Sequence, residues 1–319
     1  MNSTRDHAAI VPVRYRSLVA DSARWDEFEF RTGDIVISTP PKCGTTWVQM
    51  LCALLIFDGP DLSAPLDELS PWLDMCNQSI ESVRTKLAKQ SHRRFIKTHT
   101  PLDGIPVREN VTYVVVGRDP RDVAVSYEHH RANMDFEHFL DLRAQVMGTD
   151  GQEEFGPSQP DSDDPAERFR QFVRSDSLFG APSLAGVLHH MQTAWQHRRA
   201  GNVVLLHYAD LTAALPLETR RLAAALGIPL TEIRASALAR EASLDRMRAR
   251  AGELAPESSR ENWKDVSAFF RAGGFGEWRE RMDEQLAAEY NARVAALVPA
   301  DVAAWTHGGR IASGIDPHA

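Results

Sequence analysis

The sequence predicts an α/β fold in which helices flank both faces of a central parallel sheet. Short apolar runs rich in β-branched residues alternate with helical segments, which is typical of a parallel sheet with covering helices. The length of 319 residues is enough for one large α/β domain or two small ones. No internal repeat or linker divides the chain, so we expect a single domain over residues 1–319.

Four segments have the composition of buried parallel strands. "RRFIKTH" is ended by Pro101, and "VTYVVVGRDP" carries β-branched residues in series up to Gly117. The predicted strands have the approximate bounds Gly33–Ser38, Arg93–His99, Val111–Pro120 and Asn202–Leu211. The predicted helices have the approximate bounds Thr45–Phe57, Arg121–Ala132, Leu184–Arg199, Leu217–Leu226, Thr231–Ala239 and Asp283–Leu297.

Composition indicates a soluble enzyme and argues against some classes of partner. The net charge of −8 disfavours a general nucleic-acid binder, which would normally be basic. The three cysteines are sparse and odd in number, which fits a reducing cytosol better than a disulfide framework. The N-terminus lacks the apolar core of a signal peptide, and "MLCALLIF" is too short to span a bilayer. We therefore expect a cytoplasmic protein; peripheral membrane contact and the oligomeric state stay open.

A segment between about residues 148 and 164 interrupts the alternation of strands and helices. "GTDGQEEFGPSQPDSDD" is acidic and rich in Gly, Pro, Ser and Asp, which predicts a mobile surface loop. A lid over a site and simple disorder are both open interpretations of it.

The first strand is followed by a loop whose composition suits an anion. In "STPPKCGTTW" a strand-to-helix turn directs backbone N–H groups and the positive end of a helix dipole at one point. Gly44 permits close approach of a ligand, Thr45 and Thr46 add hydroxyl donors, and Lys42 adds a positive charge. The alternative is a structural turn with an exposed lysine. The lysine precedes the glycine, so the loop does not match the sequence motif of a nucleotide-hydrolase loop.

The third strand ends in an arginine where an ATP–Mg²⁺ enzyme usually has a metal-ligating carboxylate. Arg118 presents a fork that pairs with phosphate, and Ser126 can add a hydroxyl from the following helix. Asp119 and Asp122 could be metal ligands, although capping the helix N-terminus is the better interpretation for at least one of them. The pattern favours a second anion site over a cation site.

These segments resemble the cytosolic-type sulfotransferases. "TPPKCGTTW" resembles their 5′-phosphosulfate-binding loop, and "YVVVGRDPRDVAVSY" resembles their 3′-phosphate-binding segment. "IKTHTP" resembles the strand end that carries their catalytic histidine, and "FFRAGGFGEW" resembles their C-terminal R-K-G-x-x-G-x-W segment. The spellings "SPWLD" and "HYADL" are most similar to the actinobacterial, including mycobacterial, glycolipid sulfotransferase branch.

The resemblance implies a P-loop-like sulfotransferase fold and an activity. The donor would be 3′-phosphoadenosine 5′-phosphosulfate (PAPS), the product 3′-phosphoadenosine 5′-phosphate (PAP), and the acceptor a hydroxyl of a glycolipid or other lipid-like molecule. His99 would be the general base, and the usual histidine pKa of about 6.5 suits that task. Lys97 would bind the sulfuryl oxygens and Lys42 the bridging oxygen. No metal is expected, because lysines and backbone dipoles supply the positive field.

The resemblance also assigns the donor contacts. Arg118 and Ser126 would hold the 3′-phosphate, and Trp47 would stack on the adenine with Tyr208 nearby. The structural alternatives are core packing for Trp47 and a purely structural hydroxyl for Tyr208. The remaining predicted donor-binding residues are Cys43, Gly44, Thr45, Thr46, Ser243, Leu244, Phe270, Arg271, Ala272 and Gly273.

The sequence departs from the family pattern at several positions. Ala272 replaces the usual lysine, so donor affinity could fall unless Arg279 or Arg281 compensates. Cys43 replaces the usual loop serine, and the dimerisation pattern of many animal members is absent after Trp278. The acceptor pocket is expected to include Trp72, Leu73, Met75, Met134, Phe136 and Phe155.

Two alternatives to a sulfotransferase remain at this stage. One is a nucleotide kinase or ATPase of related fold, against which the lysine-first loop and the strand-end arginine argue. The other is a non-catalytic module with a degenerate donor site, to which Ala272 gives some weight.

Overall fold

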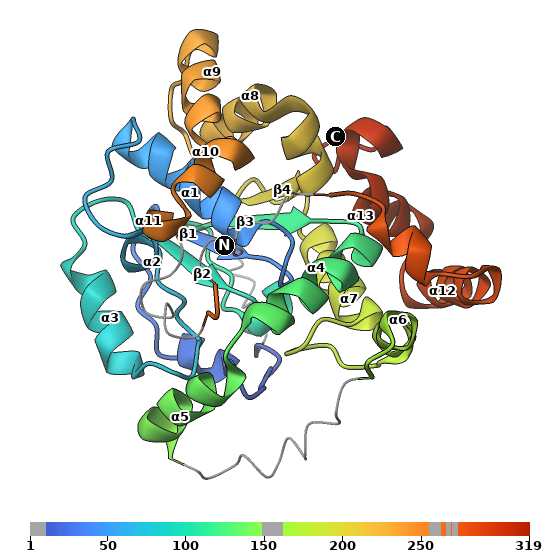
Figure 1. The fold of residues 1–319 in the computed structure, drawn as a ribbon. Helices are drawn as coiled ribbons and strands as arrows, with labels where there is room; N and C mark the ends of the chain where they lie inside the picture. The colour runs from blue at the N-terminus through green and yellow to red at the C-terminus, as the bar shows by residue number, and fades with distance from the viewer. Residues whose placement is uncertain (1–10, 149–161, 255–262, 266–268, 270–273) are drawn as a thin grey trace, which may run out of the picture.

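The structure is a computed structural model that describes residues 11–148, 162–254, 263–265, 269 and 274–319. Within them, four strands form one parallel sheet in the order β2-β1-β3-β4 (Figure 1). The strands are β1 (Ile35–Ser38), β2 (Phe95–Thr98), β3 (Thr112–Gly117) and β4 (Val203–His207). The predicted α/β class and the four predicted strands are confirmed, each strand being shorter than its apolar segment.

Helices cover both faces of this sheet (Figure 1). The α-helices are α1 (Thr45–Phe57), α2 (Leu66–Leu69), α3 (Ile80–Lys89), α4 (Pro120–Asn133), α5 (Phe136–Met147), α6 (Pro165–Arg174), α7 (Leu184–Gln196), α8 (Tyr208–Ala225), α9 (Glu232–Glu241), α10 (Leu244–Ala249), α11 (Ala251–Leu254), α12 (Glu284–Leu297) and α13 (Ala300–Ser313). The short 3₁₀ helices are η1 (Ser22–Trp25), η2 (Leu102–Gly104) and η6 (Glu277–Arg281).

Two apolar cores lie on the two faces of the sheet. Successive residues of each strand alternate between them, so Val36 faces one core while Ile35 and Ile37 face the other. The core that contains Val36 also takes side chains from α4, α6, α7, α12 and α13. The opposite core takes side chains from α1, α2, α8, α9 and α10. This burial on both faces explains why the strands read as continuous apolar runs.

The helices α2, α3, α5, α6, α10, α11 and α13 were not predicted, and one predicted helix has different bounds. The helix expected at Leu217–Leu226 begins at Tyr208, because the chain stays helical on both sides of a kink at Ala214 and accommodates Pro216. Helix α13 was not predicted, since Gly309 breaks its helical pattern with a φ of 70°. Asp210 repairs that break by accepting hydrogen bonds from the N–H groups of Arg310 at 2.7 Å and Ile311 at 2.9 Å.

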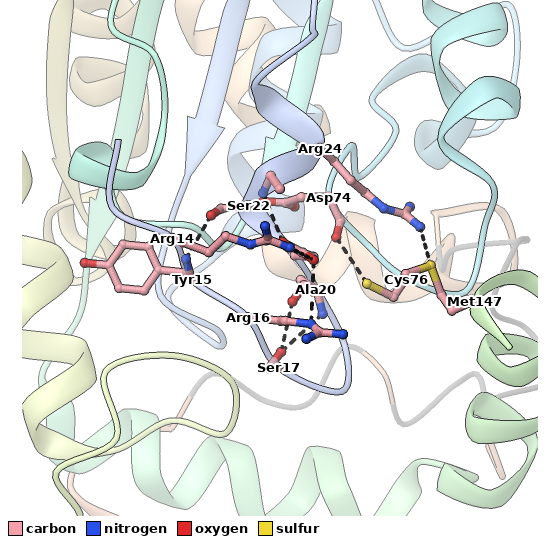
Figure 2. A network of polar contacts seen from close by, with 12 residues as sticks. Arg14, Tyr15, Arg16, Ser17, Ala20, Ser22, Arg24, Asp74, Cys76 and Met147 are labelled. Atoms are coloured by element: carbon pink, nitrogen blue, oxygen red, sulfur yellow. Dashed lines mark hydrogen bonds and ion pairs between the residues drawn. The ribbon is translucent and has the colours of Figure 1, made fainter. Parts of the chain in front are cut away.

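The N-terminal segment braces the chain that precedes α3. The N–H of Asp21 donates to the carbonyl of Asp74 at 2.9 Å, and the N–H of Cys76 donates to the carbonyl of Val19 at 2.8 Å. Arg24 donates to the carbonyl of Gln78 at 2.8 Å. Figure 2 shows part of this region, with Asp74 and Cys76 beside the N-terminal segment and Arg24 reaching from that segment toward Met147. Residues 74–76 therefore have a fixed backbone.

The carboxyl ends of the four strands meet at one edge of the sheet. Ser38 of β1 is in register with Thr98 of β2, and Gly117 of β3 with His207 of β4. The chain leaves β1 toward β2 on one side and later toward β3 on the other, which is where open α/β sheets form a ligand crevice. Among the helices that the structure describes, none combines the length and hydropathy needed to cross a bilayer.

Candidate active site

A cavity of about 340 Å³ opens at the carboxyl edge of the sheet. It is of the size of a ligand pocket and joins residues that are far apart in the sequence. Eleven of the predicted site residues line it: Lys42, Gly44, Thr45, Thr46, Trp47, Lys97, His99, Arg118, Ser126, Tyr208 and Leu244. The structure therefore brings the loop after β1 together with the ends of β2, β3 and β4.

The loop between β1 and α1 has the geometry of an anion cradle. Gly44 precedes the helix with a φ of 101°, and a Cβ atom there would lie 3.1 Å from the ring of Tyr208. Glycine is thus needed for both its conformation and the close approach. Gly44 supplies no side-chain cap, so the first N–H groups of α1 have no capping acceptor from it. The Thr45 hydroxyl bonds the hydroxyl of Thr39 at 2.6 Å.

Arg118 ties this loop to the end of β3. Its Nη1 donates to the carbonyl of Lys42 at 2.9 Å, and its guanidinium lies 4.2 Å from the ring centre of Tyr208. The side chain is only 6% exposed, yet its Nε has no hydrogen-bond partner among the described residues. A buried guanidinium donor without a partner is costly, and a bound phosphate would satisfy it. The residues present fit the phosphates of the donor that the resemblance implies.

An aromatic pair borders the same end of the cavity. Trp47 donates from Nε1 to the carbonyl of Ala242 at 2.7 Å, which fixes the plane of its indole. Its ring meets that of Tyr208 edge to face, with 5.3 Å between the ring centres. Leu244 adds an apolar side chain to this wall. The arrangement places two aromatic rings and an aliphatic side chain in the cavity lining beside the phosphate loop.

Lys42 has an unusual electrostatic environment. Its backbone φ of 69° is uncommon outside glycine, and burial together with Arg118 and Lys97 lowers its pKa to about 7. Its Nζ lies 3.2 Å from Nδ1 of His130, and burial lowers the pKa of His130 well below the usual value. A neutral His130 can accept a hydrogen bond from the lysine. Lys42 is therefore poised to gain a proton when an anion enters the cavity.

His99 follows β2 and is held in one tautomer. Its Nδ1 lies 2.7 Å from the carbonyl oxygen of Thr39, and because a carbonyl only accepts, Nδ1 carries the proton. The Nε2 atom then keeps its lone pair. Burial, followed by the charge of Lys97, lowers the pKa of His99 well below its usual value. His99 is thus neutral at physiological pH and able to accept a proton at Nε2.

Lys97 and His99 both contact the ring of Trp72. The Nζ of Lys97 lies 4.2 Å from the Trp72 ring centre, and the His99 ring meets the same indole edge to face at 4.6 Å. Burial lowers the pKa of Lys97 to about 8, whereas Asp67 and Asp74 oppose that shift. A base and a cation therefore lie side by side in the cavity lining, next to one indole ring.

Another part of the cavity lining, which we call the acceptor end, is apolar. Met75, Met134, Phe139, Phe179 and Val187 line it and come from separate parts of the chain. Of the side chains predicted for an acceptor pocket, Trp72, Met75 and Met134 line the cavity. Leu73 does not, because it is fully buried in the core beneath. Phe136 does not line it either, and Phe155 lies outside the described residues.

Some predicted donor contacts are placed elsewhere. Cys43 is buried in the core, where burial raises the pKa of its thiol to about 12. Ser243 caps α10 by accepting from the N–H of Arg246 at 3.4 Å and does not line the cavity. Arg281 pairs with Glu128 at 3.3 Å, and Arg279 lies over the Trp278 ring. Phe270, Arg271, Ala272 and Gly273 lie outside the described residues.

Sequence reasoning missed three contributors to the site. His130 contacts Lys42, and the ring of Trp263 lies 4.9 Å from that of His130. Asp74 lies behind the strand end that carries Lys97 and His99, and it accepts hydrogen bonds on both carboxylate oxygens. The only sequence signal for Asp74 was an acidic residue inside the mostly apolar "SPWLDM".

Comparison with known proteins decides the family. The family model described as "Sulfotransferase domain" matches residues 32–298. The chain belongs to the sulfotransferase family. A glycolipid sulfotransferase of Mycobacterium bovis is 44% identical over 331 residues, covering 99% of each chain, and one of Mycobacterium tuberculosis is 44% identical over 330 residues with the same coverage. Sulfotransferase 1B1 of Mus musculus is 25% identical over 278 residues, 83% of each chain.

Solved sulfotransferase-like structures share the fold. Retinol dehydratase in complex with androsterone and the inactive cofactor PAP aligns with a TM-score of 0.68 at 23% identity, over 88% of this chain and 84% of that one. Mouse sulfotransferase SULT7A1 complexed with PAP aligns with a TM-score of 0.66 at 19% identity, over 92% of this chain and 97% of that one. The predicted P-loop-like sulfotransferase fold and the predicted PAPS-dependent sulfotransferase activity are confirmed, and they replace the kinase alternative.

Proposed function

We propose that this sulfotransferase moves a sulfuryl group from PAPS to a hydroxyl of a glycolipid acceptor, with His99 as general base. One observation carries the proposal: the Nε2 of His99 has no hydrogen-bond partner among the described residues, and His99 lines a cavity that joins the phosphate loop to an apolar part of the lining. The relatives named glycolipid sulfotransferase, which match the whole chain, support the acceptor class.

The donor end of the cavity would bind the nucleotide. The first N–H groups of α1, with Thr45 and Thr46, would hold the 5′-phosphate, and Arg118 with Ser126 would hold the 3′-phosphate. The Nε of Arg118, which has no partner among the described residues, supports that assignment. Trp47 would pack on the adenine. Bound here, the nucleotide supplies the sulfuryl group that is transferred.

The residues between the two ends would carry the transfer. His99 Nε2 accepts the proton of the acceptor hydroxyl as its oxygen bonds to sulfur. Lys97 places positive charge on the sulfuryl oxygens, and Lys42 stabilises the phosphate oxygen as its bond to sulfur breaks. Lys42, Lys97 and Arg118 together supply the positive field that the transfer needs, so the proposal includes no metal ion.

The proposal extends to the setting of the enzyme. We propose a single domain in the cytoplasm, and its three cysteines, all free and buried, suit a reducing compartment. The apolar end of the cavity would receive the lipid part of the acceptor from the water phase or from a membrane surface.

A transfer assay tests the function. The purified protein is incubated with ³⁵S-labelled PAPS and a panel of glycolipids, and labelled lipid is counted after extraction. We expect labelled glycolipid and, in calorimetry, binding of PAP. Binding of PAP without a labelled product over the whole panel would instead support the non-catalytic module. Absence of both product and binding would overturn the proposal.

A further inference from the structure

We propose that Asp74 is a positioning residue, which fixes His99 and Lys97 for sulfuryl transfer without touching the reacting atoms. The proposal rests on the proposed role of His99 as the base. The observation behind it is the Asp74 carboxylate, which is fully buried directly behind His99. This carboxylate accepts hydrogen bonds from Thr98 and Thr100, the residues on the two sides of His99 in the chain.

Four donors converge on the Asp74 carboxylate. Its Oδ2 accepts from Trp25 Nε1 at 2.9 Å and from the hydroxyls of Thr98 and Thr100 at 2.6 Å each. Its Oδ1 accepts from Nε1 of Trp72 at 2.6 Å. Asp74 is 0% exposed, so these bonds replace its water shell completely.

Three of these four donors lie next to His99 or Lys97, either in the chain or in space. Thr98 and Thr100 flank His99 in the chain, and the Thr98 hydroxyl also accepts from the N–H of Thr100 at 2.9 Å. The turn that carries His99 is therefore fastened on both sides. The indole of Trp72 contacts both Lys97 and His99, and its N–H donates to Asp74. Asp74 thus sets the place of both groups.

The network is built for the ionised form of Asp74. Burial raises the pKa of this carboxyl, and the hydrogen bonds from Thr100, Thr98, Trp25 and Trp72 oppose that rise. An indole N–H can only donate a hydrogen bond. If Oδ1 were protonated, its hydrogen would face the N–H of Trp72, and the two donors would conflict. An apolar residue in this space would leave four buried donors without an acceptor, so the network requires an acceptor at this position. The charge of Asp74 also favours the protonated form of Lys97.

The backbone of Asp74 is fixed independently of its side chain. Its carbonyl accepts from the N–H of Asp21, and it lies in the braced segment of Figure 2. A substitution at position 74 will therefore change the side-chain network more than the path of the chain.

Asp74→Asn is the first test. The carbonyl of the new side chain can replace Oδ2 toward its three donors, which leaves the amide N–H₂ facing the N–H of Trp72. That conflict displaces the indole and loosens Lys97 and His99. We expect kcat to fall about 100-fold, as for a misplacement of about 1 Å, while the Kd for PAP stays within about twofold. Unchanged kcat would overturn the proposal.

Trp72→Phe supplies a rescue that a general loss of folding would not show. In that background the amide introduced at position 74 no longer meets an N–H group. We expect Asp74→Asn to cost less than about fivefold in kcat there, against about 100-fold in the parent. Equal costs in the two backgrounds would mean that the hydrogen bond to Trp72 does not transmit the effect, and the proposal would fail.

The pH profile provides a second readout. The charged and titratable groups that face Lys97 are Asp67, Asp74, Lys42, His99 and His130. Loss of the Asp74 charge removes one of the two groups that favour protonated Lys97, whose pKa is about 8. The alkaline limb of kcat should therefore move to lower pH in Asp74→Asn. An alkaline limb that stays in place would contradict the electrostatic part of the proposal.

Asp103→Asn is the matched control. Asp103 is a half-buried carboxylate near His99 in the chain, but it accepts from the Tyr15 hydroxyl at 2.9 Å and does not bond Trp72, Thr98 or Thr100. We expect kcat within about threefold of the parent. A loss as large as that of Asp74→Asn would show that removal of any carboxylate here suffices, and the proposal would fail.

A further variant separates this inference from the proposed function. If His99→Ala keeps full activity, the proposed base is wrong. If His99→Ala is inactive and Asp74→Asn keeps full activity, this inference alone is wrong.

Discussion

The two ends of the cavity are built in different ways. The donor end is mostly polar, and most of it comes from one continuous segment, the loop from Lys42 to Gly44 and the first turn of α1, completed by Arg118 and Tyr208 at neighbouring strand ends. The acceptor end is apolar, and its side chains come from the segment around Met75, the α4–α5 region, and the chain that leads into and begins α7. His99 lies where the two ends meet.

This difference separates the donor binding that the family shares from the acceptor binding that is specific to one enzyme. Phosphate groups can be bound by backbone N–H groups and a few cations, so a short local motif is enough to build the donor end. An apolar acceptor is recognised by shape and buried area, which many side chains supply together. The donor end therefore identifies the family, and the acceptor end determines which molecule is sulfated.

The largest expected effect is at the junction of the two ends. His99→Ala removes the proton acceptor, and we expect kcat to fall about 1000-fold, within the range for loss of a general base. The Kd for PAP, measured by calorimetry, should stay within about twofold because His99 contacts the phosphate loop only at the Thr39 carbonyl and is not among the residues proposed to hold the phosphates. A parallel loss of transfer and of PAP binding would mean that His99 is structural.

The next effect tests the donor end. Arg118→Ala removes charge-assisted hydrogen bonds to the 3′-phosphate, so we expect PAP to bind about 100-fold more weakly. Arg118→Lys, which keeps the charge but loses the fork, should recover part of the affinity. Binding of the analogue without a 3′-phosphate should change much less. If both nucleotides lose the same affinity, Arg118 does not contact that phosphate.

A smaller effect is expected at the acceptor end. Met134→Ala removes an apolar side chain from the cavity wall, and we expect the KM for the glycolipid to rise about tenfold while the KM for PAPS is unchanged. Met134→Leu, which conserves volume, serves as the control and should stay near the parent value. A change in the KM for PAPS instead would show that the two ends are not separate.

The smallest effect is the number of protons that the protein takes up when PAP binds. The pKa of Lys42 is about 7, so at pH 8 this lysine is mostly neutral until an anion binds and raises its pKa. Binding of PAP should therefore take up about one proton at pH 8 and almost none at pH 6. Calorimetry in buffers of different ionisation enthalpy measures this, with Lys42→Met as control. No uptake at pH 8 would contradict the lowered pKa.

The parts that could be predicted from the sequence are those that are local in the chain. The strands, the loop with Lys42 and Gly44, and the strand-end residues Lys97, His99 and Arg118 follow from short patterns of apolar and polar residues. Parallel strands must bring their carboxyl ends together, so the position of the site followed from the fold.

The parts that were missed depend on contacts between distant segments. Asp74 gains its role from Trp25, Thr98 and Thr100, and His130 meets Lys42 across 88 residues of chain. Helix α13 needs Asp210, 100 residues away, to cap its second half. Periodicity cannot reveal such partners, because each residue alone reads as an ordinary polar side chain.

One measurement tests the central claim most directly. Sulfated lipids are compared by untargeted mass spectrometry in bacterial cells that express the parent protein, the His99→Ala variant, or neither. The account predicts a glycolipid that is heavier by one sulfuryl group only in cells with the parent protein. A sulfated glycolipid at equal level in all three, or no sulfated lipid in any, would contradict it.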